Sequence, residues 1–258
     1  MKFALVMIAV LVIIGGGTYW FLRSSQDEMT EEVVTEDVIQ EVLPVEVETA
    51  DPESIAEVES QPIEVADDPV PVLDESTDWV MKKTKPLLEH PIFEGFFKQK
   101  EIIRKLVAVV DRMSRGENPY RHISYLKPSG SFEVEGEGES LVMSPENNRR
   151  TTALIEAIDA MPAHQLLSFY KKSEPLFEEA YNELGNLDHW GDAVDRVFNE
   201  IEQFSYPEGP IELVGRKGVY IFKDSSLEEL SPLQKALIRM GPEHANKVKL
   251  LARTYHRR

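Results

Sequence analysis

Residues 92–116 read IFEGFFKQKEIIRKLVAVVDRMSRG and contain the strongest helical pattern outside the N-terminal segment of the chain. Their apolar side chains recur three and four positions apart, as one face of an amphipathic helix requires. These apolar positions are Phe97, Ile102, Ile103, Leu106, Val107, Val110 and Met113. Gly116 is expected to end the helix, because glycine readily adopts the left-handed conformation found just past helix C-termini. The stretch therefore predicts a central helix of a folded domain.

Shorter patterns on both sides of this stretch predict further helices. They lie from residues 74–76 to Leu88 and then over 151–161, 163–184, 193–204, 231–240 and 242–258. Pro175 lies inside the helix over 163–184 and is expected to kink or split it, because proline has no N–H to donate. Gly185 is expected to end that helix. Residues 131–144 and 211–222 have the alternation of short β elements. The predicted fold class is mainly α, a single helical domain over residues 73–258 with one or two small β-hairpins.

The N-terminal residues 3–22 read FALVMIAVLVIIGGGTYWFL and include no charged side chain. A helix of this length spans about 30 Å, the thickness of the hydrocarbon core of a bilayer. We expect residues 1–23 to form a transmembrane anchor, and a cleaved signal peptide is the alternative. The amino terminus and Lys2 lie before the segment and Arg23 alone lies after it, so the excess of positive charge favours an N-terminus in the cytoplasm. The expected location is the inner membrane, single-pass, with the C-terminal domain in the periplasm.

The net charge of −18 is concentrated in one part of the chain. Residues 24–81 hold many acids and no Lys or Arg, and the stretch 24–72 also contains five prolines and no aromatic residue. Such a composition cannot bury enough apolar surface to fold, so residues 24–72 are predicted to be a disordered acidic linker. The remaining domain is close to neutral. Nucleic-acid binding is not expected, because no basic domain is left to neutralise phosphates.

The composition also excludes several kinds of chemistry. The chain has no cysteine, which rules out disulfides, thiolate zinc sites, iron–sulfur clusters and thiol nucleophiles. Its six histidines show none of the HxH, HxxxH or HExxH spacings that place two ligands on one metal. No GxSxG motif occurs. No cofactor is therefore expected.

Two acidic clusters remain as candidate sites. The segment Asp188–Asp192, DHWGD, could hold a metal or supply acid–base chemistry, although a helix-entry turn capped by Asp188 or Asp192 is favoured. The second cluster could bind a divalent cation weakly, with a solvated hairpin as the favoured alternative. It consists of Glu133, Glu135, Glu137 and Glu139, whose charges also argue against a phosphate-binding glycine loop.

Asp111 is the third candidate, because it interrupts the apolar run VAVVDRM. If buried, this carboxylate needs a cation such as Arg104, Arg112 or another, since an unpaired buried charge is costly. A structural ion pair is favoured over a catalytic acid or base. No residue is therefore assigned a catalytic, cofactor-binding or metal-binding role.

Several segments resemble domain-of-unknown-function family 3014, a bacterial family. They are PVLDESTDWV, KLVAVVDRMSRG, FEVEGEGESLVMSP, FYKKSEPLFEEAYNELG and LSPLQKALIRMGPEHANKVK. The resemblance covers Pro71 to about Arg253, and RMGPEHANKVK (Arg239–Lys249) is its most distinctive block. Members of the family typically carry one N-terminal membrane helix and a variable linker. The resemblance implies no activity and no site residues.

The C-terminal segment carries the most specific indication of binding. Apolar positions on one side of a helix are Ala245, Val248, Leu251, Ala252 and Tyr255, and the bases elsewhere are Lys247, Lys249, Arg253, Arg257 and Arg258. These bases either stabilise the helix by interacting with the negative end of its dipole, at the C-terminus, or contact an anionic partner. We expect a membrane-tethered, non-catalytic interaction module with a protein partner in the cell envelope. The alternative is an envelope-associated, hydrolase-like enzyme, which would need Asp111, His189 or the acids of residues 133–139 to converge in a pocket.

Overall fold

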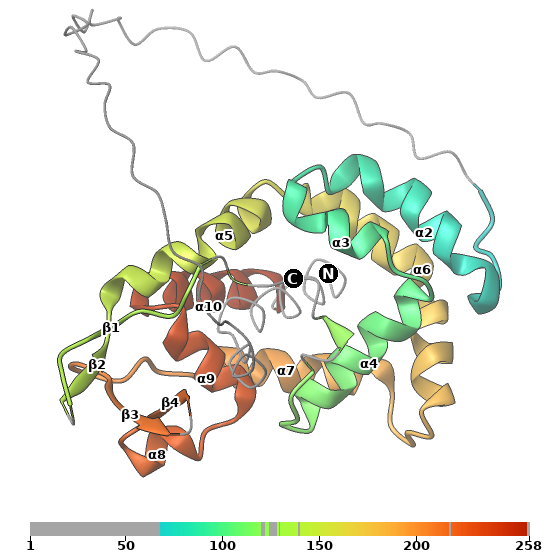
Figure 1. Cartoon of the computed structure of the whole chain (residues 1–258). Helices are drawn as coiled ribbons and strands as arrows, with labels where there is room; N and C mark the ends of the chain where they lie inside the picture. The colour runs from blue at the N-terminus through green and yellow to red at the C-terminus, as the bar shows by residue number, and fades with distance from the viewer. Residues whose placement is uncertain are drawn as a thin grey trace, which may run out of the picture. The chain divides into compact units, whose positions relative to one another are not determined.

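The computed structural model describes residues 68–119, 122–123, 128, 130–138, 140–216 and 218–256 (Figure 1). The predicted membrane helix, residues 1–23, and residues 24–67 of the predicted linker lie outside this part. No helix of the described residues is long and apolar enough to cross a bilayer. Asp68 and Val70 contact the helical domain: the Asp68 carboxylate pairs with Lys82 and Lys83, each at 3.1 Å, and Val70 packs against the core.

The described residues form a mainly helical domain with a small β-sheet. Its helical elements are η2 (Leu73–Glu75), α2 (Ser76–Thr84), η3 (Lys85–Leu87), η4 (Pro91–Phe93), α3 (Glu94–Phe97), α4 (Ile102–Ser114), η6 (Pro145–Thr151), α5 (Thr152–Asp159), α6 (Ala163–Glu183), α7 (Trp190–Gln203), α8 (Ser225–Glu228), α9 (Pro232–Arg239) and α10 (Pro242–His256). The strands are β1 (Val134–Glu135), β2 (Leu141–Met143), β3 (Glu212–Arg216) and β4 (Val219–Phe222). The predicted fold class is confirmed for this part of the chain.

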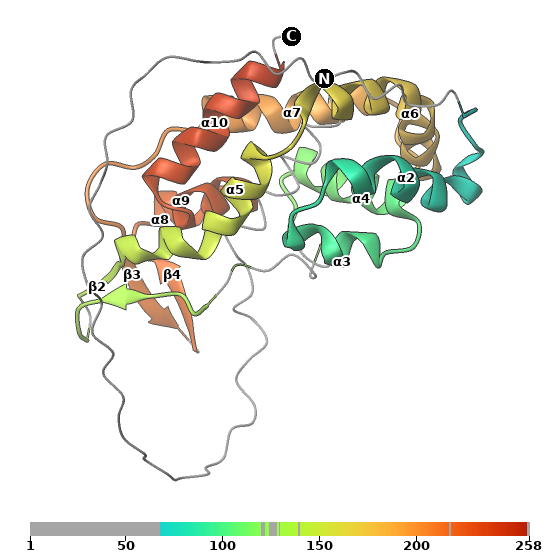
Figure 2. The same cartoon turned by 90° about the horizontal axis from the view of Figure 1, so that it is seen from above.

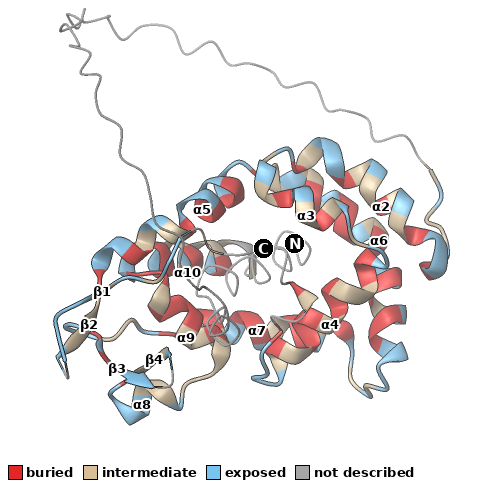
Figure 3. Ribbon diagram, viewed as in Figure 1, coloured by how far each residue is buried: buried red, intermediate tan, exposed pale blue. Residues whose placement is uncertain are grey.

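Helix α4 lies at the centre of the helical core, as its apolar pattern predicts. It packs against both α6 and α7, and most of its residues are buried (Figure 3). Gly116 ends it with φ = +70°, and the backbone N–H groups of Gly116 and Glu117 donate to the carbonyls of Met113 and Arg112 at 2.9 and 2.8 Å. These two bonds form a Schellman motif, so the predicted stop is confirmed.

The helix is shorter at its start than the pattern of apolar residues suggests. Phe97 ends the separate helix α3, and α4 begins only at Ile102. Between them Glu101 has φ = +53°, a left-handed conformation that breaks the helical path, and its N–H donates to Thr77 Oγ1 at 3.1 Å. The expectation of one pattern running through Phe97 is therefore wrong, because spacing alone cannot reveal a single left-handed residue.

Helix α6 runs without interruption through Pro175. The expected split does not occur, although the proline removes one backbone donor. The residues that follow are fully buried on the core side, and this burial holds the second half of the helix in place; they are Leu176, Phe177, Ala180 and Tyr181. Gly185, with φ = +81°, follows the helix end as expected.

The four strands form one antiparallel sheet in the order β1-β2-β3-β4. Both predicted hairpins are present, and they are joined because β2 pairs with β3, with Leu141 opposite Leu213. Opposed and alternate residues share a face of a sheet, so one face is apolar. Its residues are Val134, Leu141, Met143, Leu213, Tyr220 and Phe222. In Figure 2 the segment that leads into α5 and helix α9 lie on one side of the sheet.

Helix α10 packs against α7 with the face that its sequence predicts. Ala245, Val248 and Ala252 are at most 1 % exposed, and Leu251 is partly buried, whereas the side chain of Tyr255 lies outside the described part. Two of the predicted surface bases have structural contacts. Lys247 pairs with Asp159 of α5, and Lys249 donates to the carbonyl of Phe204.

Candidate anion-binding site

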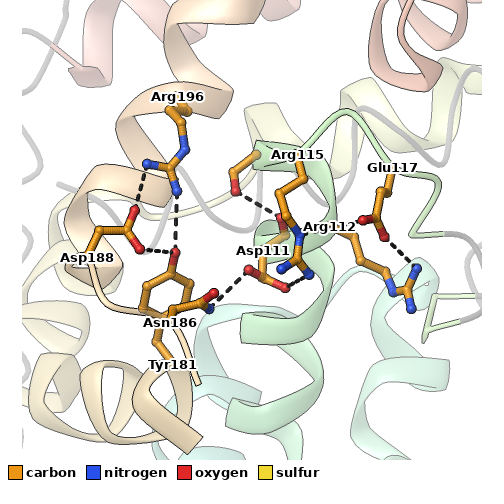
Figure 4. A network of polar contacts seen from close by, with 9 residues as sticks. Asp111, Arg112, Arg115, Glu117, Tyr181, Asn186, Asp188 and Arg196 are labelled. Carbon is orange, nitrogen blue, oxygen red and sulfur yellow. Dashed lines mark hydrogen bonds and ion pairs between the residues drawn. The ribbon is translucent and has the colours of Figure 1, made fainter. Parts of the chain in front are cut away.

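Asp111 is buried on α4 and is bound from two sides (Figure 4). Arg115, one turn later on the same helix, forms an ion pair with one carboxylate oxygen. Asn186, in the turn between α6 and α7, donates from Nδ2 to the other oxygen at 3.1 Å. The pairing expected of a buried Asp111 is present, but Arg104 and Arg112 bind other carboxylates instead. Asp111 therefore fastens α4 to the α6–α7 turn.

The segment Asp188–Asp192 forms the entry to α7. His189 is the residue before the helix, and its backbone N–H donates to the Asp192 carboxylate at 3.2 Å. The Asp188 carboxylate accepts from Tyr181 Oη at 3.0 Å and from Arg196 Nη1 at 2.7 Å (Figure 4). The helix-entry interpretation fits this arrangement, with Asp192 as the capping acid. Asp111 and the segment Asp188–Asp192 thus both lie at the α6–α7 turn, and each makes contacts that support the fold.

The acids of residues 133–137 lie in and beside the β1–β2 hairpin rather than near that turn. Glu135 accepts a hydrogen bond from Ser144 Oγ at 2.8 Å. Glu139 lies outside the described residues. Within the described residues no group of three or more His, Asp or Glu side chains is arranged to hold a metal ion. The hairpin interpretation fits this geometry.

A different pair of side chains stands out, Arg150 at the end of η6 and Arg239 at the end of α9, which we call the arginine pair. The guanidinium carbon of Arg150 lies 5.5 Å from the ring centre of Phe132, and that of Arg239 lies 5.0 Å from the ring centre of Phe222. Phe222 belongs to the apolar face of the sheet. Each guanidinium thus packs against an aromatic ring, as in a cation–π contact.

Asn147 holds η6, the element that carries Arg150, against the segment that contains Phe132. Its side chain is 1 % exposed, accepts from the Glu133 N–H at 2.9 Å and donates to the Glu133 carbonyl at 2.7 Å. It also donates to the Ser144 carbonyl at 2.9 Å. These hydrogen bonds, between the Asn147 side chain and backbone groups, connect η6 to the segment that contains Phe132. They therefore hold Arg150 near the ring of Phe132.

Arg239 is placed by the start and the end of α9. Ser231 and Gln234 form a capping box at the first turn, which defines where the helix begins. At its last turn the carbonyl of Ile238 accepts from Tyr206 Oη at 3.1 Å. Gly241 has φ = +84°, a conformation that favours glycine, and it turns the chain into α10.

A buried hydrogen bond connects η6 to α10 beside the arginine pair. Thr151 Oγ1 lies 2.6 Å from His244 Nδ1, and it also donates to the Asn148 carbonyl at 3.0 Å. Which of the two groups donates in this hydrogen bond depends on the tautomer of the His244 ring. Burial lowers the pKa of His244, which keeps the ring neutral at neutral pH.

The arginine pair differs from the other half-buried arginines in having no counter-ion among the described residues. Neither member makes an ion pair or a side-chain hydrogen bond with any residue that the structure describes, and Arg150 Nε is buried without an acceptor. The other half-buried arginines of the described part each bind a carboxylate: Arg104 binds Glu183 at 2.6 Å, and Arg112 binds Glu117 at 2.9 Å. In so acidic a chain, an uncompensated pair is a candidate anion-binding site.

Burial and mutual repulsion act on this pair. Burial lowers the pKa of both arginines, and the charge of Arg239 lowers the pKa of Arg150 further. Glu133 opposes the shift at Arg150 and Glu228 opposes it at Arg239, without contacting either guanidinium. Both side chains remain cationic, because arginine keeps its proton in proteins. The site therefore carries two partly desolvated positive charges.

The sequence alone does not identify this site. Arg239 opens the RMGPEHANKVK block and Arg150 follows another arginine in NNRRTT, but neither position shows a recognised binding motif. Their proximity depends on the tertiary fold, which brings the ends of η6 and α9 together over the sheet. Only the distinctiveness of the RMGPEHANKVK block, which also contains His244, points toward this region.

These elements define a mainly helical domain that carries a small four-stranded antiparallel sheet. The chain belongs to the family described as "Protein of unknown function (DUF3014)", whose family model matches residues 102–255. The match begins with α4 and includes both arginines, whereas α2 and α3 precede it. No curated protein and no solved structure matches the chain.

Proposed function

We propose that this protein is a non-catalytic binding module whose arginine pair binds an anionic group of a partner in the cell envelope. The observation that carries the proposal is the absence of any described counter-ion for two half-buried arginines. An uncompensated buried charge destabilises a folded protein, so its presence favours a functional role. A bound anion would supply the negative charge that the pair lacks, and it would accept hydrogen bonds from the guanidinium N–H groups.

A binding function is favoured over a hydrolytic one, because the residues considered as acid–base candidates already have structural contacts. Asp111 is bound by Arg115 and Asn186, and the segment around His189 forms the entry to α7. The arginine pair itself contains only hydrogen-bond donors and is always charged, which suits recognition of an anion and does not suit proton transfer.

The binding test uses the full-length chain in a non-ionic detergent, with pyrophosphate and citrate as probes. Isothermal titration calorimetry near neutral pH should detect at least one of them. Replacing both arginines (Arg150→Met with Arg239→Met) should weaken that binding at least about a hundredfold, because two charge-assisted hydrogen bonds are lost. Methionine keeps an apolar stem that packs on the phenylalanine rings.

The matched control replaces Arg216 and Arg253, which are exposed and have no described ion pair. The double variant Arg216→Met with Arg253→Met has the same net charge as the test variant, and it should bind like the wild type. The proposal is wrong if neither probe binds the wild type. It is also wrong if both variants lose affinity equally.

We propose in addition that residues 1–23 tether the module to the inner membrane, with the folded domain in the periplasm and residues 24–72 as a spacer. The support is the uncharged run of residues 3–22 and the acidic, proline-containing composition that follows. Alkaline phosphatase fused to the C-terminus should be active, because that enzyme needs the periplasm to fold. An inactive fusion would contradict the periplasmic orientation, and release of soluble protein from the membrane fraction would contradict the tether.

A further inference from the structure

We infer that the group bound by the arginine pair is a phosphate monoester, an inference that rests on the proposed function and specifies its ligand. The first argument is charge. The site holds two cations, and a monocarboxylate would neutralise only one of them. A phosphate monoester carries about −1.5 to −2 charges at neutral pH and can match both.

The second argument is the arrangement of donors. The ring of Phe132 covers one guanidinium and the ring of Phe222 covers the other. A guanidinium that packs against a ring carries its N–H groups in its own plane, so the ring itself does not use them as donors, and Arg150 Nε is left without an acceptor. Two such groups from different elements suit the three oxygens of a tetrahedral phosphoryl group, whereas a planar carboxylate is satisfied by one guanidinium.

The third argument concerns the two nearby acids. Glu228 binds Lys235 Nζ at 3.0 Å and accepts from the Phe222 N–H at 3.0 Å. Glu133 is held by its backbone to Asn147. Neither carboxylate contacts the arginine pair, so a ligand has no internal anion to displace.

The fourth argument is preorganisation. Arg150 is held through Asn147 and through the Thr151–His244 hydrogen bond, and Arg239 is the last residue of a capped helix. A ligand therefore meets donors whose supporting elements are already ordered, which reduces the entropy lost on binding.

The test compares two small probes of similar size on the full-length chain in non-ionic detergent. Glycerol 3-phosphate is the phosphate monoester, and glycerate is its monocarboxylate counterpart. Calorimetry should show glycerol 3-phosphate binding at least about tenfold more tightly, since it offers a second charge and an additional acceptor. Equal affinities, or tighter binding of glycerate, would overturn the inference.

Three double variants test whether the arginine pair causes the preference for glycerol 3-phosphate. Arg150→Met with Arg239→Met should abolish the preference for glycerol 3-phosphate, and Arg216→Met with Arg253→Met should keep it. Arg150→Lys with Arg239→Lys retains the charge but removes the planar donor groups, so it should weaken glycerol 3-phosphate binding about tenfold or more. Unchanged affinity in the lysine variant would contradict recognition by the guanidinium groups.

A methionine variant that fails to fold would also count against the inference. Removing two uncompensated charges from a ligand site should leave the ligand-free protein at least as stable as the wild type. Urea unfolding measures this directly. A marked loss of stability would show that the arginines serve the fold instead of a ligand.

The phosphate monoester can belong to a soluble molecule or to a lipid headgroup. Repeating the titration with dioctanoyl phosphatidate in mixed micelles separates these sources: binding about tenfold tighter than that of glycerol 3-phosphate identifies a lipid, and no gain identifies a soluble ligand. If pyrophosphate and citrate bind through the arginine pair while both monoesters fail, the ligand class is wrong and the proposed function stands. If no probe binds, both fail.

Discussion

Replacing Val248 with aspartate is expected to unfold the domain or nearly so. Val248 is fully buried on α10, on the face that packs against α7. Val248→Asp places a charge among buried apolar side chains and removes the apolar contacts of the valine. Burial of an unpaired charge costs more than about 4 kcal/mol, which is a large part of the 5–15 kcal/mol that stabilises a typical domain. Urea unfolding followed by circular dichroism measures the loss.

Leu250 supplies the matched control on the same helix. It is 63 % exposed, so Leu250→Asp introduces the same charge into solvent. Its free energy of unfolding should stay within about 0.5 kcal/mol of the wild type. If the two variants lost equal stability, the assignment of the buried face of α10 would be wrong.

The second large effect is expected at Trp190, the first residue of α7. Its ring is 0 % exposed, stacks on Phe177 at 5.5 Å between centroids and meets Tyr181 edge-on at 5.8 Å. Its Nε1 donates to Tyr170 Oη at 3.0 Å. Trp190→Ala should lower the free energy of unfolding by about 3–5 kcal/mol, because it opens a cavity among these rings and leaves the Tyr170 hydroxyl without its donor.

Trp190→Phe separates packing from hydrogen bonding. Phenylalanine keeps most of the apolar volume but has no N–H, so this variant should lose only about 1–2 kcal/mol. Chemical denaturation of both variants gives the comparison. Equal losses for alanine and phenylalanine would show that the hydrogen bond to Tyr170, rather than the ring packing, dominates at this position.

Local patterns were sufficient for most individual elements. The apolar spacing of Ile102–Met113 predicted α4, Gly116 and Gly185 predicted helix ends, and the alternation around residues 131–144 and 211–222 predicted two hairpins. These features succeed because helix and strand periodicity, and the left-handed conformation of glycine, are properties of short segments. The same local rules missed Glu101, a left-handed residue whose N–H is satisfied by Thr77 of another helix.

Partners across the chain could not be predicted in the same way. The sequence left the cation that binds Asp111 open between Arg104, Arg112 and another residue, and helix geometry and the α6–α7 turn bring Arg115 and Asn186 to it. Pro175 was expected to split α6, but burial of the following turns outweighs the loss of one backbone hydrogen bond. In both cases packing against distant segments decides among options that the local sequence leaves open.

The sequence by itself determined the mainly helical class, the buried faces of α4 and α10, the absence of cysteine chemistry and the family. Tertiary structure alone decided that β2 pairs with β3, which makes one apolar sheet face from two hairpins. It also decided that Arg150 packs on Phe132 and Arg239 on Phe222, near enough for the charge of Arg239 to act on Arg150. Periodicity is a property of neighbouring residues, whereas the distance between two charges depends on how the whole chain folds. The candidate site is therefore visible only in three dimensions.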